Sequence, residues 1–279
     1  MEPHEVAGLE EHRLAVGVAE ISEHVRPVQG GGVACRGVPG SWNNMTVGVG
    51  MHGALPDDWR DELRSICAWY EGAGVEPRLE VAPFADMSLL KHCEAERFVV
   101  RNFDNVLYRV LRAGEKAVPA QTPDPRIRVR LVNKDDDAEI RAFSRIAMTG
   151  FHAPGHEFAE SDYEMWARIV KHPRTRSVLA SVETPNGLVP AGAGSIELHG
   201  EIACLFGLST VHEYRRLGIQ QSLIAARLNL AMEHGVKVAT IGSRPGAGTE
   251  RNVRRMGFQT AYTKVILARP GPGLVAARG

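Results

Sequence analysis

The chain has 279 residues, enough for two small domains or one large one. Its 33 Lys and Arg residues balance its 33 Asp and Glu residues, which excludes the basic surplus of a nucleic-acid-binding protein, and no stretch approaches the roughly 18 apolar residues that span a membrane. The acidic start Met1–Glu5 lacks the apolar segment of a signal peptide, and the four cysteines form no Cys-x-x-Cys pair, so we expect a cytoplasmic protein with reduced thiols.

Helical and extended patterns alternate through the first half of the chain. In order, they predict a helix, a strand, a helix, a strand, a helix and a strand at residues 6–24, 45–49, 56–72, 79–82, 88–96 and 105–111. The triple glycine 30–32 breaks the first helical pattern.

Glycines in this half form Gly48-x-Gly50-x-x-Gly53, which matches the dinucleotide-binding fingerprint. That fingerprint holds a pyrophosphate only where the glycines open directly into a helix. Here Ala54-Leu55-Pro56 intervenes before the helix begins. We therefore keep a nicotinamide or flavin site only as an alternative.

The second half begins after a segment of different composition. Residues 112–125 carry three prolines and no apolar periodicity, which predicts a linker. After it, we expect a strand, two helices, a hairpin of two strands, a third strand, a helix, a strand, a helix and a last strand, at residues 127–132, 135–149, 161–171, 177–183, 188–198, 202–208, 219–234, 236–241, 249–256 and 262–268. Asn186-Gly187 is typical of the turn of such a hairpin.

The centre of this half combines an apolar strand, a basic turn and a helix. The run Ile202–Leu208 predicts a strand buried on both faces, and Arg215, Arg216 and Gly218 separate it from the helical stripe Ile219, Leu223, Ala226 and Leu230. The first turn of a helix presents amides without partners and a partial positive charge. A glycine leaves room for an anion there, and arginines add charged donors. The turn thus predicts a phosphate site; the alternative is a solvated basic turn whose glycine only starts the helix.

This turn also resembles a known family motif. Arg215-x-x-Gly218-x-Gln220 is similar to the acetyl-CoA signature of the GCN5-related N-acetyltransferases (the GNAT family), [Gln/Arg]-x-x-Gly-x-[Gly/Ala], and Thr210–Arg215 is similar to the segment that leads into it. Two positions depart from the family pattern, Gln220 in place of Gly or Ala and His212 in place of the frequent Pro. Gln220 is compatible with binding because the amide presented to the phosphate belongs to the backbone.

The resemblance covers about residues 126–270, where the expected order β-α-α-β-β-β-α-β-α-β is that of the family. It implies an α/β fold of layered α+β type, a mixed, mostly antiparallel sheet flanked by helices, with acetyl-CoA as co-substrate. Thr249–Phe258 resembles the helix beside the pantetheine arm, where Asn252 would offer a polar contact; an exposed asparagine is the alternative. The implied cofactor-binding residues are Leu208, Thr210, Val211, Arg215, Arg216, Leu217, Gly218, Ile219, Gln220, Gln221 and Asn252.

An internal repeat indicates two related halves. Gly74-Val75 to Arg97-Phe98 parallels Gly235-Val236 to Gly257-Phe258, each with a strand, a loop containing proline and a short helix. The first copy lacks the Arg-x-x-Gly turn, because residues 51–56, Met-His-Gly-Ala-Leu-Pro, occupy the equivalent position. We therefore expect a degenerate GNAT-like domain at 1–111, the linker at 112–125, an acetyl-CoA-binding GNAT domain at 126–270 and a flexible tail at 271–279.

The chemistry that the resemblance implies needs an oriented amine, a polarised thioester and two proton transfers. In the family, the strand before the motif separates from its neighbour and offers a backbone N–H to the thioester, a role that falls near Leu208. Glu201 or Glu197 could act as the base through a water, and Glu201 is the expected one. The alternative is that Glu201 is only a carboxylate at the end of a hairpin. The family's usual tyrosine acid is replaced by Val253, so Tyr262 is the nearest candidate.

His152-x-x-x-His156-Glu157 has a spacing that suits metal ligands on a helix, but Pro154 and Gly155 make the segment a loop. We expect no metal there. The segment falls where the family's substrate-access loop lies, so a contact with substrate and an ordinary surface loop are the two remaining interpretations.

Two functions follow from the resemblance. The first is an N-acetyltransferase that acts on a primary amine of a small molecule or peptide; the second is a non-catalytic acyl-CoA sensor or scaffold that keeps the cofactor turn. Neither requires nucleic acid or a membrane as partner, and a homodimer stays open. A dinucleotide-dependent enzyme built on Gly48 is the third alternative.

Overall fold

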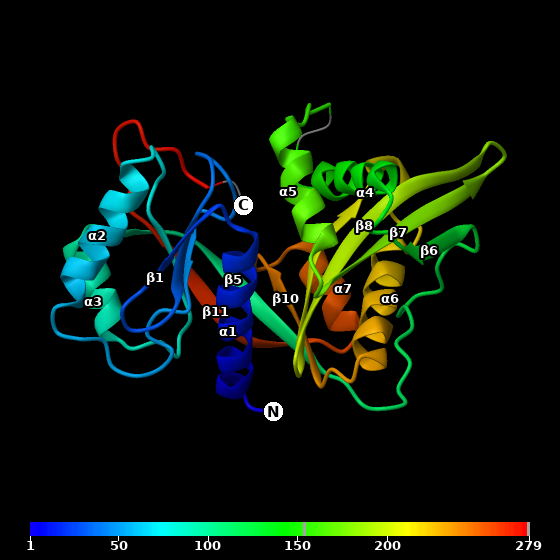
Figure 1. Ribbon diagram of the computed structural model, residues 1–279. Helices are drawn as coiled ribbons and strands as arrows, with labels where there is room; N and C mark the ends of the chain where they lie inside the picture. The colour runs from blue at the N-terminus through cyan, green and yellow to red at the C-terminus, as the bar shows by residue number, and fades with distance from the viewer. Residues whose placement is uncertain (153–154, 278–279) are drawn as a thin grey trace. The chain divides into compact units, whose positions relative to one another are not determined.

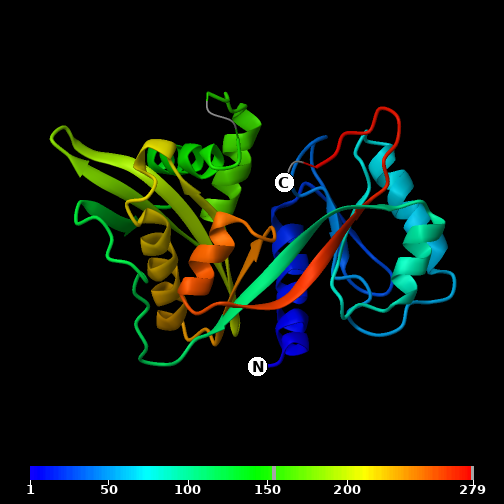
Figure 2. The same ribbon diagram turned by 180° about the vertical axis from the view of Figure 1, so that it is seen from behind.

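The computed structural model describes residues 1–152 and 155–277 (Figures 1 and 2). Residues 153–154 of the histidine-containing loop and residues 278–279 of the expected tail lie outside them. The chain divides into two compact units, residues 1–106 with 260–279, and residues 107–259. This division assigns the last strand to the first unit, whereas the sequence pattern grouped that strand with residues 126–270. The domain boundaries expected from the sequence stay a prediction.

The second unit follows the expected order of elements. Its strands are the end of β5 (Val99–Val110), β6 (Ile127–Leu131), β7 (Thr175–Thr184), β8 (Gly187–His199), β9 (Ile202–Thr210) and β10 (Val238–Ser243). Its helices are α4 (Asp137–Thr149), α5 (Glu160–Lys171), the 3₁₀ turn η1 (His212–Tyr214), α6 (Ile219–Glu233) and α7 (Gly248–Arg255). With β11 (Gln259–Ala268), they give the order that the resemblance implied, so the fold prediction is confirmed.

The sheet of this unit runs in the order β5-β10-β9-β8-β7-β6. Neighbours from β6 to β9 are antiparallel, and β9 and β10 are parallel. Side chains alternate between its two faces, as strand geometry requires. From β7, Val178 and Ala180 pack against Ile219 of α6, whereas Leu179 packs against Phe143 of α4. Helices α6 and α4 thus cover opposite faces (Figure 1).

The first unit contains α1 (Pro3–Ile21), β1 (His24–Pro27), β2 (Val33–Arg36), β3 (Met45–Val47), α2 (Trp59–Glu71), β4 (Arg78–Val81), α3 (Ser88–Ala95), the start of β5 and most of β11. Its strand order is β1-β2-β3-β4-β11-β5, with β3 and β4 parallel. The core forms around α2, whose Trp59, Leu63, Ile66 and Tyr70 recur at helical spacing and are fully buried.

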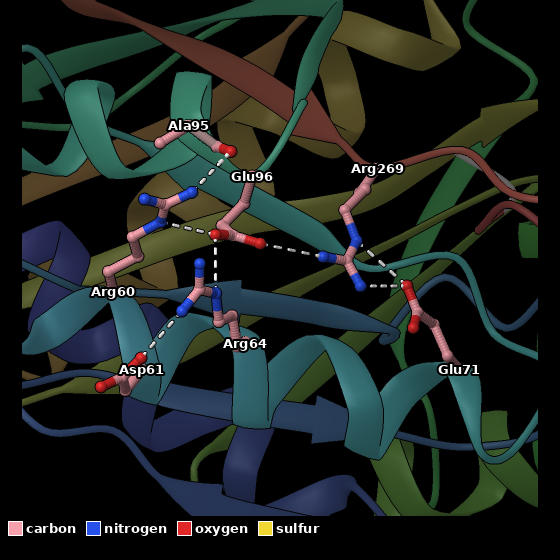
Figure 3. A network of polar contacts seen from close by, with 7 residues as sticks. All are labelled: Arg60, Asp61, Arg64, Glu71, Ala95, Glu96 and Arg269. Carbon is pink, nitrogen blue, oxygen red and sulfur yellow. Dashed lines mark hydrogen bonds and ion pairs between the residues drawn. The ribbon is translucent and has the colours of Figure 1, made fainter.

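The end of the chain is fastened to α2 and α3 of this unit. Arg269 donates to Glu71 of α2 and to Glu96, and Glu96 also accepts from Arg60 at 2.6 Å and from Arg64 at 2.9 Å (Figure 3). Within the expected flexible tail, the Val275 amide donates to the Gly74 carbonyl at 2.9 Å.

The two copies of the sequence repeat share their hydrogen bonds as well as their order of elements. The amides of Val75 and Val236 both donate to the carbonyl five residues earlier, and those of Phe98 and Phe258 do the same. In each case the helix is followed by a residue of positive φ, which directly precedes the donating amide. The repeat is therefore structural, and the parallel pair β3–α2–β4 corresponds to β9–α6–β10.

Two strands escaped sequence analysis. β1 and β2 are four residues each and form a hairpin around Gly30–Gly32, too short for a clear alternating pattern. Among the described residues, no helix has the length and apolar character required to cross a membrane.

Candidate active site

The motif forms a turn with two residues of positive φ. β9 ends at Thr210, η1 follows, and the chain passes through Arg216 (φ 67°) and Gly218 (φ 90°) into α6. Gly218 is in the left-handed region that favours glycine. An added Cβ there would also lie 2.9 Å from the Cα of Pro123 in the linker, so both backbone conformation and space require glycine at this position.

Consecutive amides at this turn have no partner among the described residues. The first backbone bond of α6 runs from the Ser222 amide to the Gly218 carbonyl at 3.0 Å. The N–H groups of residues 216–221 donate no hydrogen bond within the described chain. They adjoin the positive end of a helix of fifteen residues and form a cradle of unpartnered donors, an arrangement that favours an anion.

Arg215 and Arg216 lie beside this cradle and are exposed. Neither guanidinium makes an ion pair or a side-chain hydrogen bond with the residues that the structure describes. This contrasts with Arg126 of the second unit, which is paired with Asp124 at 2.8 Å. The two arginines are thus available to a bound anion.

The linker is ordered along α6. The Asp124 amide donates to the Leu217 carbonyl at 2.9 Å, and the Gln121 amide donates to Gln221 Oε1 at 3.0 Å. The linker therefore helps to hold the start of the helix.

Asn252 lies next to the motif. Its side-chain amide donates to Gln220 Oε1, and Gln220 Nε2 donates to Thr249 Oγ1 at 3.2 Å. Gln220 thus joins α6 to α7, which gives its departure from the family's Gly or Ala a structural role. Its side chain points to α7, while its backbone amide stays in the cradle.

The remaining implied cofactor residues lie on both sides of the turn. Leu208 and Thr210 end β9, and Ile219 is buried in the core beneath α6. The Val211 amide donates to the Ala191 carbonyl at 2.9 Å. A ligand therefore meets the Val211 side chain or carbonyl rather than its N–H.

Strand β9 separates from β10, as expected near Leu208. The parallel pairing ends at Leu205 and Ile241, although β9 continues to Thr210. On its other side, the register with β8 shifts between Ala193 and Ser195, and Gly207 has a φ of 60°. Gly207 was not among the residues predicted to be functional, although a glycine inside an apolar strand indicates such a bulge.

Glu201 does not lie near this opening. It precedes β9, six residues before Gly207, which corresponds to roughly 20 Å along an extended strand. Its carboxylate is exposed and forms an ion pair with Lys237. Glu197, the other expected carboxylate, pairs with Arg174 at 3.2 Å.

Tyr262 belongs to the first unit, and its side chain is buried there. Its hydroxyl donates to Glu11 Oε1 at 2.5 Å, and Lys264 Nζ lies 2.9 Å from the same oxygen. Burial, followed by the charge of Glu11, raises the pKa of Tyr262 well above its usual value. This hydroxyl is therefore a weak proton donor.

His152 follows the end of α4, which contacts β9. An added Cβ on Gly150 would lie 2.6 Å from Ser209 Oγ, so this end of the helix abuts the strand just beyond the bulge. His152 Nδ1 lies 3.0 Å from the Met148 carbonyl. Because a carbonyl only accepts, Nδ1–H is the donor in this contact, and Nε2 has no hydrogen-bond partner among the described residues. His156 stacks on this ring at 4.4 Å.

The described residues contain no group of three or more His, Cys, Asp or Glu side chains arranged to hold a metal ion. The Gly48 fingerprint does not meet a helix terminus either, because α2 begins at Trp59. Gly48 instead borders a cavity of about 240 Å³ in the first unit, together with Glu11 and His52.

No protein-family model and no curated protein matches the chain. Among solved structures, a GCN5-related N-acetyltransferase from Kribbella flavida has a TM-score of 0.73 at 17% identity, covering 96% of this chain and 97% of its own. A tandem GNAT protein from the clavulanic acid biosynthesis pathway has a TM-score of 0.60 at 13% identity, covering 86% of this chain and 78% of its own.

A GCN5-related N-acetyltransferase from Sphaerobacter thermophilus has a TM-score of 0.59 at 16% identity, with coverages of 81% and 73%. At such identities the similarity establishes the fold. The chain has the fold of the GNAT acetyltransferases, and the structures similar to it include a tandem member of that family.

Proposed function

We propose that this protein is an acetyl-CoA-dependent N-acetyltransferase that moves an acetyl group to a primary amine of a small molecule or peptide within a ternary complex. The observation that carries this proposal is the cradle of amides at 216–221, with Arg215 and Arg216 unpaired beside it among the described residues. The GNAT fold supports it, because the cradle follows a strand that separates from its parallel neighbour.

The cradle suits the diphosphate of CoA. Hydrogen bonds to a charged group are worth about 1.5–3 kcal/mol each, and a diphosphate presents several acceptor oxygens to the amides and guanidinium groups. Asn252 is held beside the first turn of α6 by Gln220, which supports a contact with the pantetheine arm. The gap between β9 and β10 then admits the thioester end of that arm.

The reaction joins two groups held side by side. The lone pair of a neutral amine attacks the thioester carbon, a C–N bond forms, and the carbonyl π electrons move onto oxygen. When the oxyanion collapses, the C–S bond breaks and its electron pair leaves with sulfur. The amine nitrogen loses one proton to a base, and the thiolate takes one up from water or an acid.

His152 is the proton acceptor that we propose in place of Glu201. In the neutral imidazole whose Nδ1 is protonated, Nε2 carries the lone pair that accepts a proton, and His152 comes two residues after Gly150, which abuts Ser209 beyond the bulge. Glu201 is at the far end of the strand and is paired with Lys237. The thiolate is left to water, because Tyr262 is bonded to Glu11 and is a weak acid.

A non-catalytic acyl-CoA sensor with the same cradle is the alternative. The two are separated by free thiol released from acetyl-CoA, measured with a thiol reagent across a panel of primary amines of small molecules and peptides. An enzyme releases thiol above the acceptor-free rate with at least one amine class, and mass spectrometry finds that amine heavier by one acetyl group. Binding of acetyl-CoA without any acceptor-dependent thiol release supports the sensor.

A further inference from the structure

An arginine is buried inside the second unit, on the face of the sheet that α6 covers. Arg227 of α6 has no exposed surface, and it is among the largest fully buried side chains in the described chain. Gly194 of β8 provides the space, because an added Cβ there would lie 2.9 Å from Arg227 Cζ.

Arg227 has no carboxylate partner among the described residues. Its hydrogen bonds go to backbone carbonyls, from Nε to Leu223 at 3.0 Å and from Nη1 to Ser195 at 2.9 Å and to Phe206 at 3.1 Å. The Nη2 atom is buried without a partner in the part of the chain that the structure describes. Burial lowers the pKa of Arg227 to about 9, so the guanidinium stays charged at neutral pH.

A buried cation without a counter-ion is costly and requires an explanation beyond packing, since an apolar side chain of similar size fills the same space. Its position supplies one. Ser195 and Phe206 face each other across β8 and β9 where the register shifts, so Nη1 bridges the two carbonyls beside the bulge.

The Phe206–Gly207 peptide links this arginine to the opening of the sheet. The described chain has no cis peptide bond, and in a trans peptide the C=O and the following N–H point in opposite directions. The Gly207 N–H therefore points away from Arg227, on the stretch of β9 that no longer pairs with β10. A hydrogen bond to the carbonyl of a peptide polarises its N–H and strengthens it as a donor.

We propose that Arg227 is a positioning residue that fixes and polarises the Phe206–Gly207 peptide, so that the Gly207 N–H binds the carbonyl oxygen of the acetyl thioester. This inference rests on the proposed function, and it gives the expected polarising amide near Leu208 a definite identity. Arg227 acts through the peptide and touches neither the diphosphate nor the amine.

The test is isotope-edited infrared spectroscopy of acetyl-CoA bound to the full chain, which needs no acceptor amine. The difference between carbonyl-¹³C-labelled and unlabelled acetyl-CoA isolates the thioester band, which moves to lower wavenumber when a donor polarises the carbonyl. We expect such a shift in the wild-type protein. Arg227→Met is expected to lose more than half of it with the Kd for acetyl-CoA unchanged within about threefold, while Arg227→Lys keeps most of it.

Gly194→Ala provides a second route, because its methyl group displaces the guanidinium without removing it. It should lose the shift as Arg227→Met does, and it decides the question if Arg227→Met does not fold. Arg145→Met, at an exposed arginine of α4, is the matched control and should keep the wild-type band.

The outcomes separate the two proposals. If the wild-type protein binds no acetyl-CoA, the proposed function fails. If it binds acetyl-CoA with no shift of the band, or if Arg227→Met or Gly194→Ala retains the full shift, the positioning role is wrong. Loss of binding in both variants also overturns it, because the role leaves the diphosphate site intact.

Discussion

Gly218 meets two requirements at once, a positive φ and close contact with Pro123. Gly200, in the turn between β8 and β9, meets only the first, since no described atom lies within 4 Å of the position that a Cβ would take there. The two glycines therefore distinguish the effect of backbone conformation from the effect of the cradle itself.

Gly218→Ala should weaken the binding of CoA by at least tenfold, because relief of the clash moves either the linker or the first turn of α6. Gly200→Ala should incur only the conformational cost, about 1–2 kcal/mol of unfolding free energy, and leave CoA affinity within twofold. Calorimetric titration and chemical denaturation of both variants measure these effects. Equal CoA affinities would show that the turn does not hold the diphosphate.

His152 and Glu201 are the two candidates for the base. His152→Gln should lower kcat by tenfold or more with an accepted amine, because general base catalysis contributes about 10²–10⁴-fold and water replaces part of it. Glu201→Gln should leave kcat within twofold, since its carboxylate is engaged with Lys237. Steady-state rates of thiol release decide, and the opposite ranking would restore Glu201.

Among the elements, the two copies of the repeat differ at one helix end. The second copy ends α7 with Gly257 (φ 84°), whereas the first ends α3 with Arg97 (φ 63°), one of two residues other than glycine with positive φ in the described chain. Because the left-handed conformation disfavours a side chain, the first copy carries local strain that the second lacks.

Arg97→Gly should therefore raise the free energy of unfolding by about 0.5–1 kcal/mol, the gain from relieving the strained φ less the added entropy of glycine. The reciprocal change, Gly257→Ala, should lower it by about 1 kcal/mol, since only ordinary contacts surround that position. Urea unfolding of both variants provides the comparison. A destabilised Arg97→Gly would mean that the arginine side chain holds the helix end.

Sequence patterns predicted the elements that have clear periodicity and the turn that has a chemical motif. The helix from Ile219 and the strand from Ile202 follow from their apolar spacing, and Gly218 follows from the phosphate-binding logic of a helix start. Short strands such as β1 were missed because four residues do not establish an alternation.

Pairing across the sheet could not be read from the sequence. Glu201 adjoins the motif strand in sequence, but the strand is extended, so it places the carboxylate far from the turn. Arg227 lies within a helical pattern, where a charged side chain ordinarily predicts an exposed position. Its partners are carbonyls beside the bulge at Gly207, and the register of β8 and β9 brings those carbonyls together.

At the level of the whole molecule, the first unit needs both ends of the chain. Residues 260–277 of the described chain complete it after the second unit has been traversed. Arg269 connects this returning segment to Glu71 of α2 and to Glu96 at the end of α3 (Figure 3). Burial acts to raise the pKa of Glu96, but hydrogen bonds from Arg60 and Arg64 outweigh it and lower the pKa below its usual value.

Glu96→Gln should lower the free energy of unfolding by about 1 kcal/mol at pH 7, because solvent screens the partly exposed arginines that bind the carboxylate. A carboxyl group whose pKa is lower in the folded than in the unfolded protein stabilises the fold at pH values above its unfolded pKa. That stabilisation is lost as the pH falls through the folded pKa. The difference between variant and wild type should therefore shrink as the pH falls below about 4.5. Thermal unfolding across pH tests this.

Glu94→Gln is the matched control, because Glu94 is exposed on the same helix. Glu94→Gln should leave the free energy of unfolding unchanged both at pH 7 and below about pH 4.5. A pH-independent loss in Glu96→Gln would indicate packing rather than charge.

In the proposed function, the turn between β9 and α6 holds the diphosphate of CoA. Calorimetric titration of CoA into the wild-type protein, into Arg215→Ala/Arg216→Ala and into the charge-matched control Arg112→Ala/Arg145→Ala tests it most directly. We expect saturable binding to the wild type and to the control, with a Kd at least tenfold weaker in the first double variant. Absence of binding to the wild type, or equal affinities in all three proteins, would contradict it.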